Sequence, residues 1–391
     1  MKYYLFVFSL FLQTAVALEK EPRVMPTSGI DKALLGQILF FDQNLSHHRS
    51  QSCASCHNQD TAFVDNRDNH FEKAVSQGDN PTKFGKRNSP TIMYSKYSPV
   101  FHFDPELQEY VGGQFWDGRA KHLTEQAGMP LIDPMEMGMV DKLDVAKRVI
   151  EEPMYVKLLS QHYGEQIWQH YEKVYVAIED ALATFQQQKK LLSPFDSKYD
   201  KFLKNEAKLT ALEQKGMEIF FDKSRSNCST CHQFKPFGDL QETFTNYRYY
   251  NIGVPKNQRL IMQRHVDENF VDNGLFDNPQ VNGDVTQKGK FKVPTLRNVA
   301  VTAPYMHNGA LVDLRTVLSF LNNPNLPKER QDPQFSMPEY AETIAHQYLK
   351  ASPLTEEEID ALIAFLETLT DERYLPLLEK QKAEKGSHLL K

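Results

Sequence analysis

Cysteine is scarce in this chain, since its 391 residues include only four. All four lie in two short motifs, Cys53-Ala-Ser-Cys56-His57 and Cys228-Ser-Thr-Cys231-His232. Exported proteins commonly use cysteine in disulfides, but no cysteine remains outside these motifs to build a disulfide framework. The scarcity therefore argues against a disulfide-stapled fold and points to another role for the cysteines.

The chain also lacks an excess of positive charge and a long apolar run. Its formal net charge is -6, and no stretch of lysine and arginine is dense enough to follow the phosphates of a nucleic acid. The apolar run from Tyr3 to Leu12 is shorter than the roughly 20 residues that a membrane-spanning helix needs. These absences predict a protein that neither binds nucleic acid nor inserts stably into a membrane.

The N-terminus has the pattern of an export signal. Lys2 precedes the apolar run, and Ala15-Val16-Ala17 places small residues at a cleavage site. We therefore assign residues 1–17 to a signal peptide and expect a periplasmic protein. A short buried helix that stays on the protein is the alternative interpretation.

The two cysteine motifs share the spacing Cys-x-x-Cys-His, which marks the attachment of c-type haem. Two thiols at this spacing can each form a thioether to one porphyrin, and the adjacent imidazole can bind the iron. The expected attachment residues are Cys53, Cys56, Cys228 and Cys231, with His57 and His232 as iron ligands. A zinc site would instead bring the four thiols together, and a thioredoxin-like redox pair would not need the histidines.

A short repeat precedes both motifs. Gly36-Gln-Ile-Leu-Phe-Phe-Asp42 leads to the first, and Gly216-Met-Glu-Ile-Phe-Phe-Asp222 leads to the second. Each has apolar residues at helical spacing and is interpreted as the end of an amphipathic helix before a haem-binding loop. The repeat predicts a duplicated unit with one haem in each copy.

The predicted fold class is all-α, mainly helical with long loops, in two cytochrome c-like helical domains. We expect an N-terminal domain over residues 18–200 and a C-terminal domain over 201–391, because Ser193-Pro194 interrupts the helical pattern near this boundary. One fused domain is the alternative. Further helices are predicted at Val145–Leu159, at Tyr171–Gln187 and, after a capping box of Thr355 and Glu358, at Glu358–Leu369.

The loops carry a series of motifs beyond the haem sites. In chain order they are Arg87-Asn-Ser-Pro-Thr, Phe115-Trp-Asp-Gly-Arg-Ala, Glu125-Gln-Ala, Pro134-Met-Glu-Met, Val293-Pro-Thr-Leu-Arg-Asn-Val-Ala and Thr302-Ala-Pro-Tyr-Met-His-Asn-Gly. Together they resemble the bacterial di-haem cytochrome c peroxidase family, which includes the MauG-type enzymes. The resemblance implies that hydrogen peroxide is activated at the N-terminal haem and that the C-terminal haem transfers electrons.

The resemblance also implies roles for three residues near the N-terminal haem. Glu136 and Gln126 match the family's distal glutamate and glutamine. A carboxyl group in a largely apolar pocket has a raised pKa, which suits Glu136 to a proton relay during cleavage of the O–O bond, with Gln126 positioning the peroxide. Trp116 matches a tryptophan between the two haems, a candidate bridge for electrons or holes. Simple core packing is the other interpretation of Trp116.

A calcium ion between the haems is a further implication of the resemblance. Its protein ligands match Asn88, Thr302 and Pro304, and oxygen donors suit a hard cation. His307 follows in the same motif, where it is expected either to hydrogen-bond a haem propionate or to be purely structural.

Two positions depart from the family pattern. Reductively activated peroxidases carry a distal histidine shortly before the Arg-Asn-Ser-Pro motif, at a position where this chain has Asn80. The N-terminal haem is therefore expected to be five-coordinate without prior reduction. The family's sixth ligand of the C-terminal haem, a methionine or tyrosine, is replaced by Leu321. Either another side chain then reaches the iron, or this haem is also five-coordinate. Met337 is the preferred substitute, and His346 and Met306 are the alternatives.

Three functions remain open at this point. The preferred one is a peroxidase that reduces hydrogen peroxide with electrons from a small donor protein, a cytochrome c or a cupredoxin. The second is a MauG-like enzyme that oxidises a Trp or Tyr residue of a partner protein. The third is a non-catalytic di-haem electron carrier, which the pair Gln126 and Glu136 disfavours. The resemblance also allows a homodimer.

Overall fold

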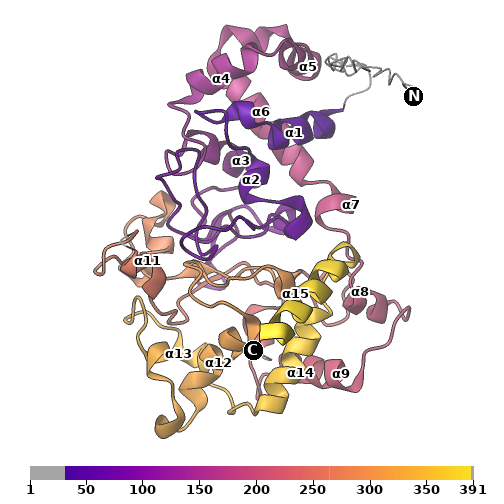
Figure 1. Cartoon of the computed structure of the whole chain (residues 1–391), viewed down its shortest axis with the longest axis vertical. Helices are drawn as coiled ribbons and strands as arrows, with labels where there is room; N and C mark the ends of the chain where they lie inside the picture. The colour runs from indigo at the N-terminus through magenta and orange to yellow at the C-terminus, as the bar shows by residue number, and fades with distance from the viewer. Residues whose placement is uncertain (1–30, 264, 389–391) are drawn as a thin grey trace, which may run out of the picture.

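The chain folds into two helical halves that follow one another in sequence and lie one above the other in Figure 1. The computed structural model describes residues 31–263 and 265–388. The signal peptide expected at residues 1–17 lies outside the described residues. In the N-terminal half the α-helices are α1 (Lys32–Phe41), α2 (Cys53–Cys56), α3 (Leu123–Ile132), α4 (Lys142–Ile150), α5 (Pro153–Tyr163), α6 (Tyr171–Gln186) and α7 (Lys189–Leu192). In the C-terminal half they are α8 (Lys198–Leu203), α9 (Ala211–Phe221), α10 (Cys228–Cys231), α11 (Gln258–Met262), α12 (Leu314–Asn322), α13 (His346–Leu349), α14 (Glu356–Glu367) and α15 (Leu375–His388).

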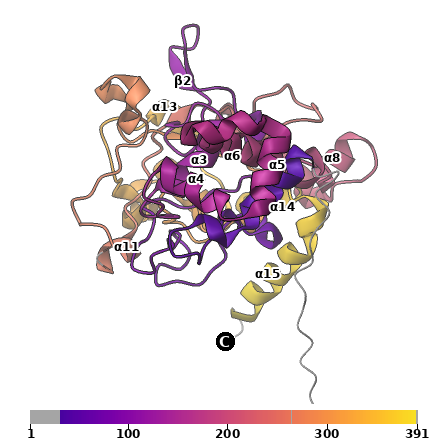
Figure 2. The ribbon, with the colours of Figure 1, turned by 90° about the horizontal axis from the view of Figure 1, so that it is seen from above.

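Short strands form two antiparallel pairs between the helices. The first pair joins β1 (His102–Asp104) to β2 (Glu109–Val111), and the second joins β3 (Tyr249–Tyr250) to β4 (Phe291–Lys292). Seen from above, the β1–β2 hairpin projects from the body of the molecule, while α3, α4, α5 and α6 are grouped at its centre (Figure 2). The rest of the described residues form mostly loops and short 3₁₀ turns, which agrees with the predicted mainly helical fold with long loops.

Helix α1 packs closely against α6. Asp31 caps α1 by accepting a hydrogen bond from the Leu34 N–H at 2.8 Å, which satisfies one of the free N–H groups at a helix start. A Cβ atom placed on Gly36 would lie 1.9 Å from the Ala181 carbonyl oxygen of α6, so only glycine allows this approach. The Phe40 ring then reaches the core beside Phe185 of α6.

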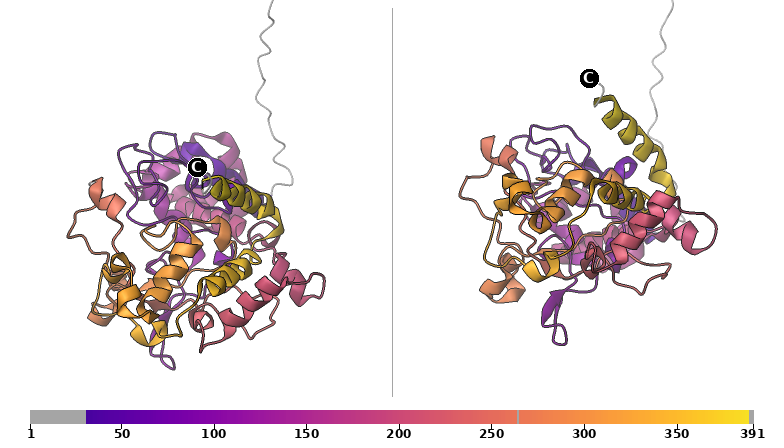
Figure 3. Two further views of the ribbon diagram at one scale, coloured as in Figure 1. Left: turned by 60° about the horizontal axis from the view of Figure 1, so that its bottom comes forward. Right: turned by 90° about the horizontal axis from the view of Figure 1, so that it is seen from below.

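The C-terminal half repeats this packing with α9 and α14. A Cβ atom on Gly216 would also lie 1.9 Å from a carbonyl oxygen, that of Ala361. Phe220 pairs with Phe365 at a ring separation of 5.2 Å, as Phe40 pairs with Phe185 at 5.1 Å. Figure 3 shows the helices of this half from below. The duplication predicted from the two similar segments that precede the cysteine motifs is therefore present in the structure.

Two of the predicted helices are as expected, and one is not. Tyr171–Gln186 forms α6, and Thr355 with Glu358 forms a capping box at the start of α14. The single helix predicted for Val145–Leu159 is wrong, because α4 ends at Ile150 and α5 begins at Pro153. Proline has no N–H and fits the first position of a helix but not its interior, so Pro153 starts a new helix.

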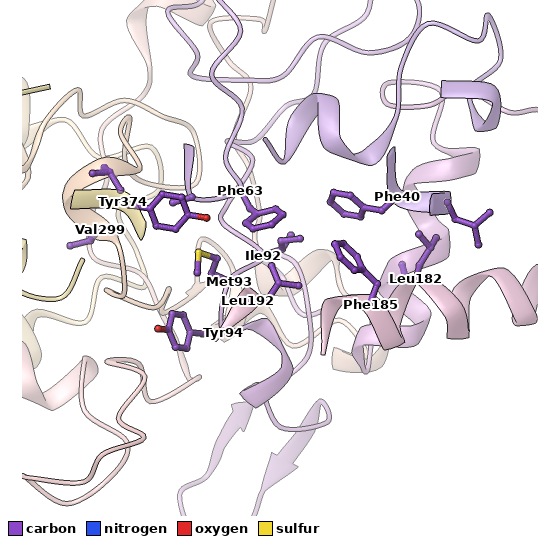
Figure 4. Packing of buried hydrophobic residues seen from close by; sticks show 14 of the residues in the cluster. Phe40, Phe63, Ile92, Met93, Tyr94, Leu182, Phe185, Leu192, Val299 and Tyr374 are labelled. Carbon is purple, nitrogen blue, oxygen red and sulfur yellow. The ribbon is translucent and has the colours of Figure 1, made fainter. Parts of the chain in front are cut away.

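One hydrophobic core extends through both halves, as Figure 4 shows. It includes Phe40 and Phe63 of the N-terminal half and Val299 and Tyr374 of the C-terminal half, with Met93 between them. Helix α7 ends at Leu192, as the interruption at Ser193-Pro194 predicted, but the core continues past it. The division into domains at residue 200 therefore stays a prediction. None of the helices in residues 31–263 and 265–388 has the length and apolar composition needed to cross a bilayer.

Candidate functional site

Each cysteine motif forms a single helical turn directly after the loop that follows α1 or α9. Cys53 begins α2 and Cys56 ends it, and Cys228 and Cys231 occupy the same positions in α10. All four thiols are free. Burial raises the pKa of Cys53, Cys56 and Cys231 to about 12, so these groups are protonated thiols at neutral pH rather than exposed reactive thiolates.

The two motifs lie in different halves and do not form a common metal site. Among the residues that the structure describes, no group of three or more His, Cys, Asp or Glu side chains is placed to hold a metal ion. The zinc alternative would need four converging ligands. Each thiol pair is instead suited to its own prosthetic group.

The two motif histidines are held in the same way. His57 Nδ1 lies 3.0 Å from the Phe63 carbonyl oxygen, and His232 Nδ1 lies 3.0 Å from that of Phe244. Because a carbonyl oxygen only accepts, Nδ1 is the donor and Nε2 keeps its lone pair. Burial lowers the pKa of His57, and lowers that of His232 to about 4. A neutral imidazole fixed through Nδ1, so that Nε2 can act as the ligand atom, is what iron ligation requires.

The Glu136 segment is held by backbone contacts on two sides. The Asp79 N–H donates to the Glu136 carbonyl at 2.7 Å, and the His47 N–H donates to the Met137 carbonyl at 2.9 Å. A Cβ atom on Gly78 would lie 2.4 Å from the Met135 carbonyl oxygen, so this loop lies directly against the segment. The position of Glu136 is therefore fixed by the fold.

Glu136 lies close enough to the first motif to interact with it electrostatically, and its charge raises the pKa of both Cys53 and Cys56. Burial raises the pKa of Glu136 to about 7, with Asp133 adding to the rise and Arg119 opposing it. A carboxyl group with such a pKa can both take and give a proton near neutral pH.

Gln126 lies on α3, the helix that adjoins the Glu136 segment. The Pro130 carbonyl of α3 accepts the Met137 N–H at 3.2 Å, and the Leu131 carbonyl accepts the Met139 N–H at 3.0 Å. The structure thus places Glu136 near the first motif, and it places Gln126 on the helix that contacts the Glu136 segment.

A cavity of about 360 Å³ lies at the second motif and reaches Trp116 and the predicted calcium ligands. The residues relevant to the predictions that line it are Cys228, Cys231, His232, Trp116, Asn88, Thr302, Pro304, His307, Met306 and Leu321. Its wall is mainly apolar, which suits a large planar ring held at one edge by cysteine.

Trp116 and Asn88 are joined on the wall of this cavity. The indole Nε1–H donates to the Asn88 carbonyl at 2.9 Å. The Asn88 side-chain NH₂ group is directed to the carbonyls of Lys73 and Ala74, at 3.4 and 3.3 Å, which leaves its amide oxygen for another partner. Together with Thr302 and Pro304 on the same wall, this oxygen fits the hard donor set that calcium prefers.

His307 has neighbours that a purely local motif does not reveal. Its ring stacks on Phe291 with centroids 3.6 Å apart, and its Nε2 lies 3.0 Å from Glu339 Oε2. Its backbone carbonyl accepts the Asn88 N–H at 2.7 Å. The observed partner of the His307 ring nitrogen is thus a carboxylate.

The candidates for the missing sixth ligand are placed very differently. Leu321 lines the cavity, and so does Met306. Met337 does not line it and is 68% exposed, and His346 is also exposed and outside the lining. The preference for Met337 is therefore not supported by its position, because the 3₁₀ turn before it carries the side chain to the surface.

The repeat extends beyond the two segments Gly36–Asp42 and Gly216–Asp222 that indicated it in the sequence. An isolated bridge joins Gln114 to Ala120 before α3, and another joins Tyr305 to Leu311 before α12. Helix α12 therefore corresponds to α3, and Val317 occupies the position of Gln126. The paired Arg-Asn of Arg87-Asn88 and Arg297-Asn298 was the sequence signal that could have indicated this longer repeat.

Sequence reasoning also missed an ion cluster that joins the two halves. Arg87 donates to Asp272 through Nε and Nη2 at 2.6 and 2.7 Å, and to Asp117 through Nη1 at 2.6 Å. Asp117 directly follows Trp116 in the chain. The cluster therefore fixes the tryptophan loop against the C-terminal half.

Comparisons with known proteins agree with this geometry. A family described as di-haem cytochrome c peroxidase matches residues 30–208. The chain is 42% identical to the methylamine utilization protein MauG of Paracoccus denitrificans over 90% of this chain and 91% of that protein. It is 27% identical to the cytochrome c551 peroxidase of Nitrosomonas europaea over 95% and 91% of the two chains. Among solved structures it is similar to the diheme peroxidase BthA from Burkholderia thailandensis, with a TM-score of 0.78, 30% identity and coverage of 88% of this chain and 87% of that one.

The resemblance seen in the loop motifs is thereby confirmed. Because the identity to MauG is well above 30% over most of both chains, the relationship covers both halves and not only the matched N-terminal part. The chain belongs to the di-haem cytochrome c peroxidase family, and it is an oxidoreductase that carries two haems and uses peroxide.

Proposed function

We propose that this protein is a periplasmic di-haem c-type peroxidase that activates hydrogen peroxide in its N-terminal half. One haem would be attached to Cys53 and Cys56 with His57 as iron ligand. The other would be attached to Cys228 and Cys231 with His232 as iron ligand. When bound, the haems supply the iron that binds peroxide and the redox centres that exchange electrons.

The asymmetry between the two distal helices carries this proposal. Glu136 lies near the first motif, and Gln126 lies on α3, the helix that adjoins the Glu136 segment. At the corresponding place of the second motif, α12 lines the cavity with Val317, Leu318 and Leu321. Aliphatic side chains can neither transfer a proton nor orient peroxide, so α12 offers no counterpart to Gln126, and we assign the acid–base chemistry to the N-terminal site.

Glu136 would act as the proton relay at that site. Cleavage of the O–O bond requires one proton to leave the peroxide oxygen nearer the iron and a proton to reach the leaving oxygen. The Glu136 carboxylate accepts the first proton and returns it to the leaving oxygen, which its pKa of about 7 allows. The Gln126 amide would donate a hydrogen bond that holds the peroxide in place.

Asn80 stands where the reductively activated peroxidases carry a histidine. The Asn80 side-chain oxygen accepts hydrogen bonds from the Thr82 N–H at 3.0 Å and from Thr82 Oγ1 at 2.8 Å. These hydrogen bonds hold the Asn80 side-chain oxygen within its own turn, and an amide is in any case a poor iron ligand. The arrangement supports a five-coordinate haem that reacts with peroxide without prior reduction.

Electrons would reach the N-terminal site from the C-terminal half. Trp116 lies on the wall of the cavity that contains the second motif, which supports a role for it in passing electrons or holes between the halves. A calcium ion held by Asn88, Thr302 and Pro304 would fix this wall. The external donor would be a small cytochrome c or cupredoxin.

The decisive experiment compares peroxide reactivity of the wild-type holoenzyme and the variant E136Q. We expect E136Q to slow the reaction with hydrogen peroxide by about 10²-fold or more in stopped-flow absorbance. The matched control is E179Q, because burial also raises the pKa of Glu179 to about 7 but Glu179 belongs to α6 and not to the Glu136 segment. An unchanged rate in E136Q would refute the assignment.

A second function, oxidation of a Trp or Tyr residue on a partner protein, is favoured by one observation. The 42% identity to a methylamine utilization protein covers 90% of this chain. Stopped-flow measurement without donor separates the two functions. A long-lived oxidised state of both haems favours protein-residue oxidation, and rapid turnover with reduced cytochrome c favours the peroxidase.

A further inference from the structure

Tyr94 and Asp371 form a hydrogen bond at the junction of the two halves. The Tyr94 phenol donates to Asp371 Oδ1 at 2.6 Å. Tyr94 is 2% exposed and Asp371 is 0% exposed. In Figure 4 the Tyr94 ring lies beside Met93, within the group of buried side chains that joins the two halves. The phenol proton therefore has a carboxylate as its neighbour rather than bulk water.

The Asp371 carboxylate is arranged as a proton acceptor. Its second oxygen accepts a hydrogen bond from Asn298 Nδ2 at 2.7 Å, and its own N–H donates to Asn298 Oδ1 at 2.8 Å. Burial raises the pKa of Asp371 to about 6, and the hydrogen bonds from Tyr94 and Asn298 oppose the rise. At neutral pH the group is ionised but accepts a proton more readily than an exposed aspartate does.

On one side, the chain segment that contains Tyr94 contacts the segment that holds the histidine of the first motif, His57. Thr91 Oγ1 donates to the Ala62 carbonyl at 2.6 Å. The next residue, Phe63, provides the carbonyl that fixes His57.

On the other side, Tyr94 is linked to the segment that holds the histidine of the second motif, His232. The Arg297 guanidinium lies 5.5 Å from the Tyr94 ring centroid and 5.3 Å from that of Phe244. The Phe244 carbonyl fixes His232. Tyr94 also lines the cavity of the second motif, so it lies between the two haem-binding segments.

We propose that Tyr94 is a redox-active residue, separate from Trp116, which stores one oxidising equivalent with Asp371 as its proton acceptor. The proposal rests on the proposed peroxide activation. Hydrogen peroxide takes up two electrons and two protons to become two water molecules, and Tyr94 would supply one of these electrons by way of the haems. The bound haems would supply the other electron.

The oxidation of Tyr94 is a coupled loss of an electron and a proton. The phenol O–H bond breaks, the proton moves to Asp371 Oδ1, and a neutral tyrosyl radical remains beside a protonated carboxyl group. Without a nearby base, oxidation of a buried tyrosine would leave an uncompensated positive charge, which burial strongly disfavours. When the external donor returns the electron, the proton moves back to the phenol.

The chain contains a matched pair for comparison. Tyr155 also donates to a carboxylate, Asp42 Oδ2, at the same distance of 2.6 Å. Tyr155 does not line the cavity at the second motif. It belongs to α5 and contacts the end of α1. The hydrogen bond is thus alike in both pairs, whereas the position relative to the haem-binding segments differs.

The test is freeze-quench EPR of the holoenzyme mixed with hydrogen peroxide, with ring- or β-deuterated tyrosine to identify a tyrosyl signal. We expect a tyrosyl radical in the wild-type protein and in Y155F, and its loss in Y94F and D371N. Spin trapping followed by peptide mass spectrometry of the wild-type protein should place the adduct on Tyr94. This second measurement needs no variant to fold.

The outcomes separate this proposal from the proposed function. A radical that persists in Y94F, or an adduct found only elsewhere, would overturn the role of Tyr94 while leaving peroxide activation intact. A wild-type protein that reacts with peroxide but gives no tyrosyl signal or adduct would do the same. A wild-type holoenzyme that does not react with peroxide would overturn both.

Discussion

Gly36 of α1 lies directly against the Ala181 carbonyl oxygen of α6, where a methyl group would stand 1.9 Å from that oxygen. Real Cβ atoms do not approach an oxygen so closely, so the two helices touch through the backbone. Gly216 and Ala361 form the same contact in the other half. The two contacts set the distance between the helix before each cysteine motif and the helix that supports it.

Replacing either glycine by alanine should destabilise the protein. The added methyl group must push the two helices apart, and overpacking of this kind costs about 1–3 kcal/mol. We expect G36A and G216A each to lower the midpoint of urea unfolding. G85A is the control, because a Cβ atom there would lie 3.7 Å from its nearest neighbour. Equal stability of all three variants would contradict the packing described.

The rate of peroxide activation should depend on pH through Glu136. Its pKa of about 7 lies above the ordinary value, so the carboxylate that must accept the first proton is lost as the pH falls below about 7. The rate of the first step in stopped-flow absorbance should therefore fall as the pH drops below about 7, and it should be constant at higher pH. E136Q should be slow and should lack this pH dependence. A wild-type profile that is flat from pH 5 to 9 would contradict the assignment.

The sequence predicted the parts of the site that depend on local spacing. The Cys-x-x-Cys-His motifs, the run-ups at Gly36 and Gly216 and the capping box at Thr355 are all short-range patterns, because helix periodicity and caps are set within a few residues. The loop motifs then led to the correct family. Pro153 shows the limit of periodicity, since the apolar spacing continues across a position where the helix is broken.

The parts that were missed depend on residues far apart in the chain. Leu321 lines the cavity of the second motif, whereas Met337, which is favoured by its distance along the chain, is exposed. The pairing of Arg87 with Asp272 and of Tyr94 with Asp371 joins segments separated by 185 and 277 residues. No local pattern predicts such contacts, because they form only when the two halves pack together.

The substitution L321M should provide a sixth ligand for the C-terminal haem. Leu321 lines the cavity of the second motif, and a methionine there places a thioether sulphur among apolar neighbours. We expect L321M to convert ferric high-spin haem to low-spin haem in EPR, relative to the wild type. L326M is the control, because Leu326 does not line the cavity. If L321M and the wild type have identical spectra, the side chain at this position does not face the iron.

The ion pair between Arg297 and Asp200 should be more important for stability than any on the surface. Both side chains are 0% exposed, and Arg297 donates to the two Asp200 oxygens at 2.6 and 2.9 Å. Removing one charge leaves the other buried without its partner, which costs about 3–5 kcal/mol. D200N should therefore unfold at a clearly lower urea concentration. D360N removes one of the two exposed partners of Arg315 and should cost at most about 1 kcal/mol. Similar midpoints for the two variants would contradict the importance of the buried pair.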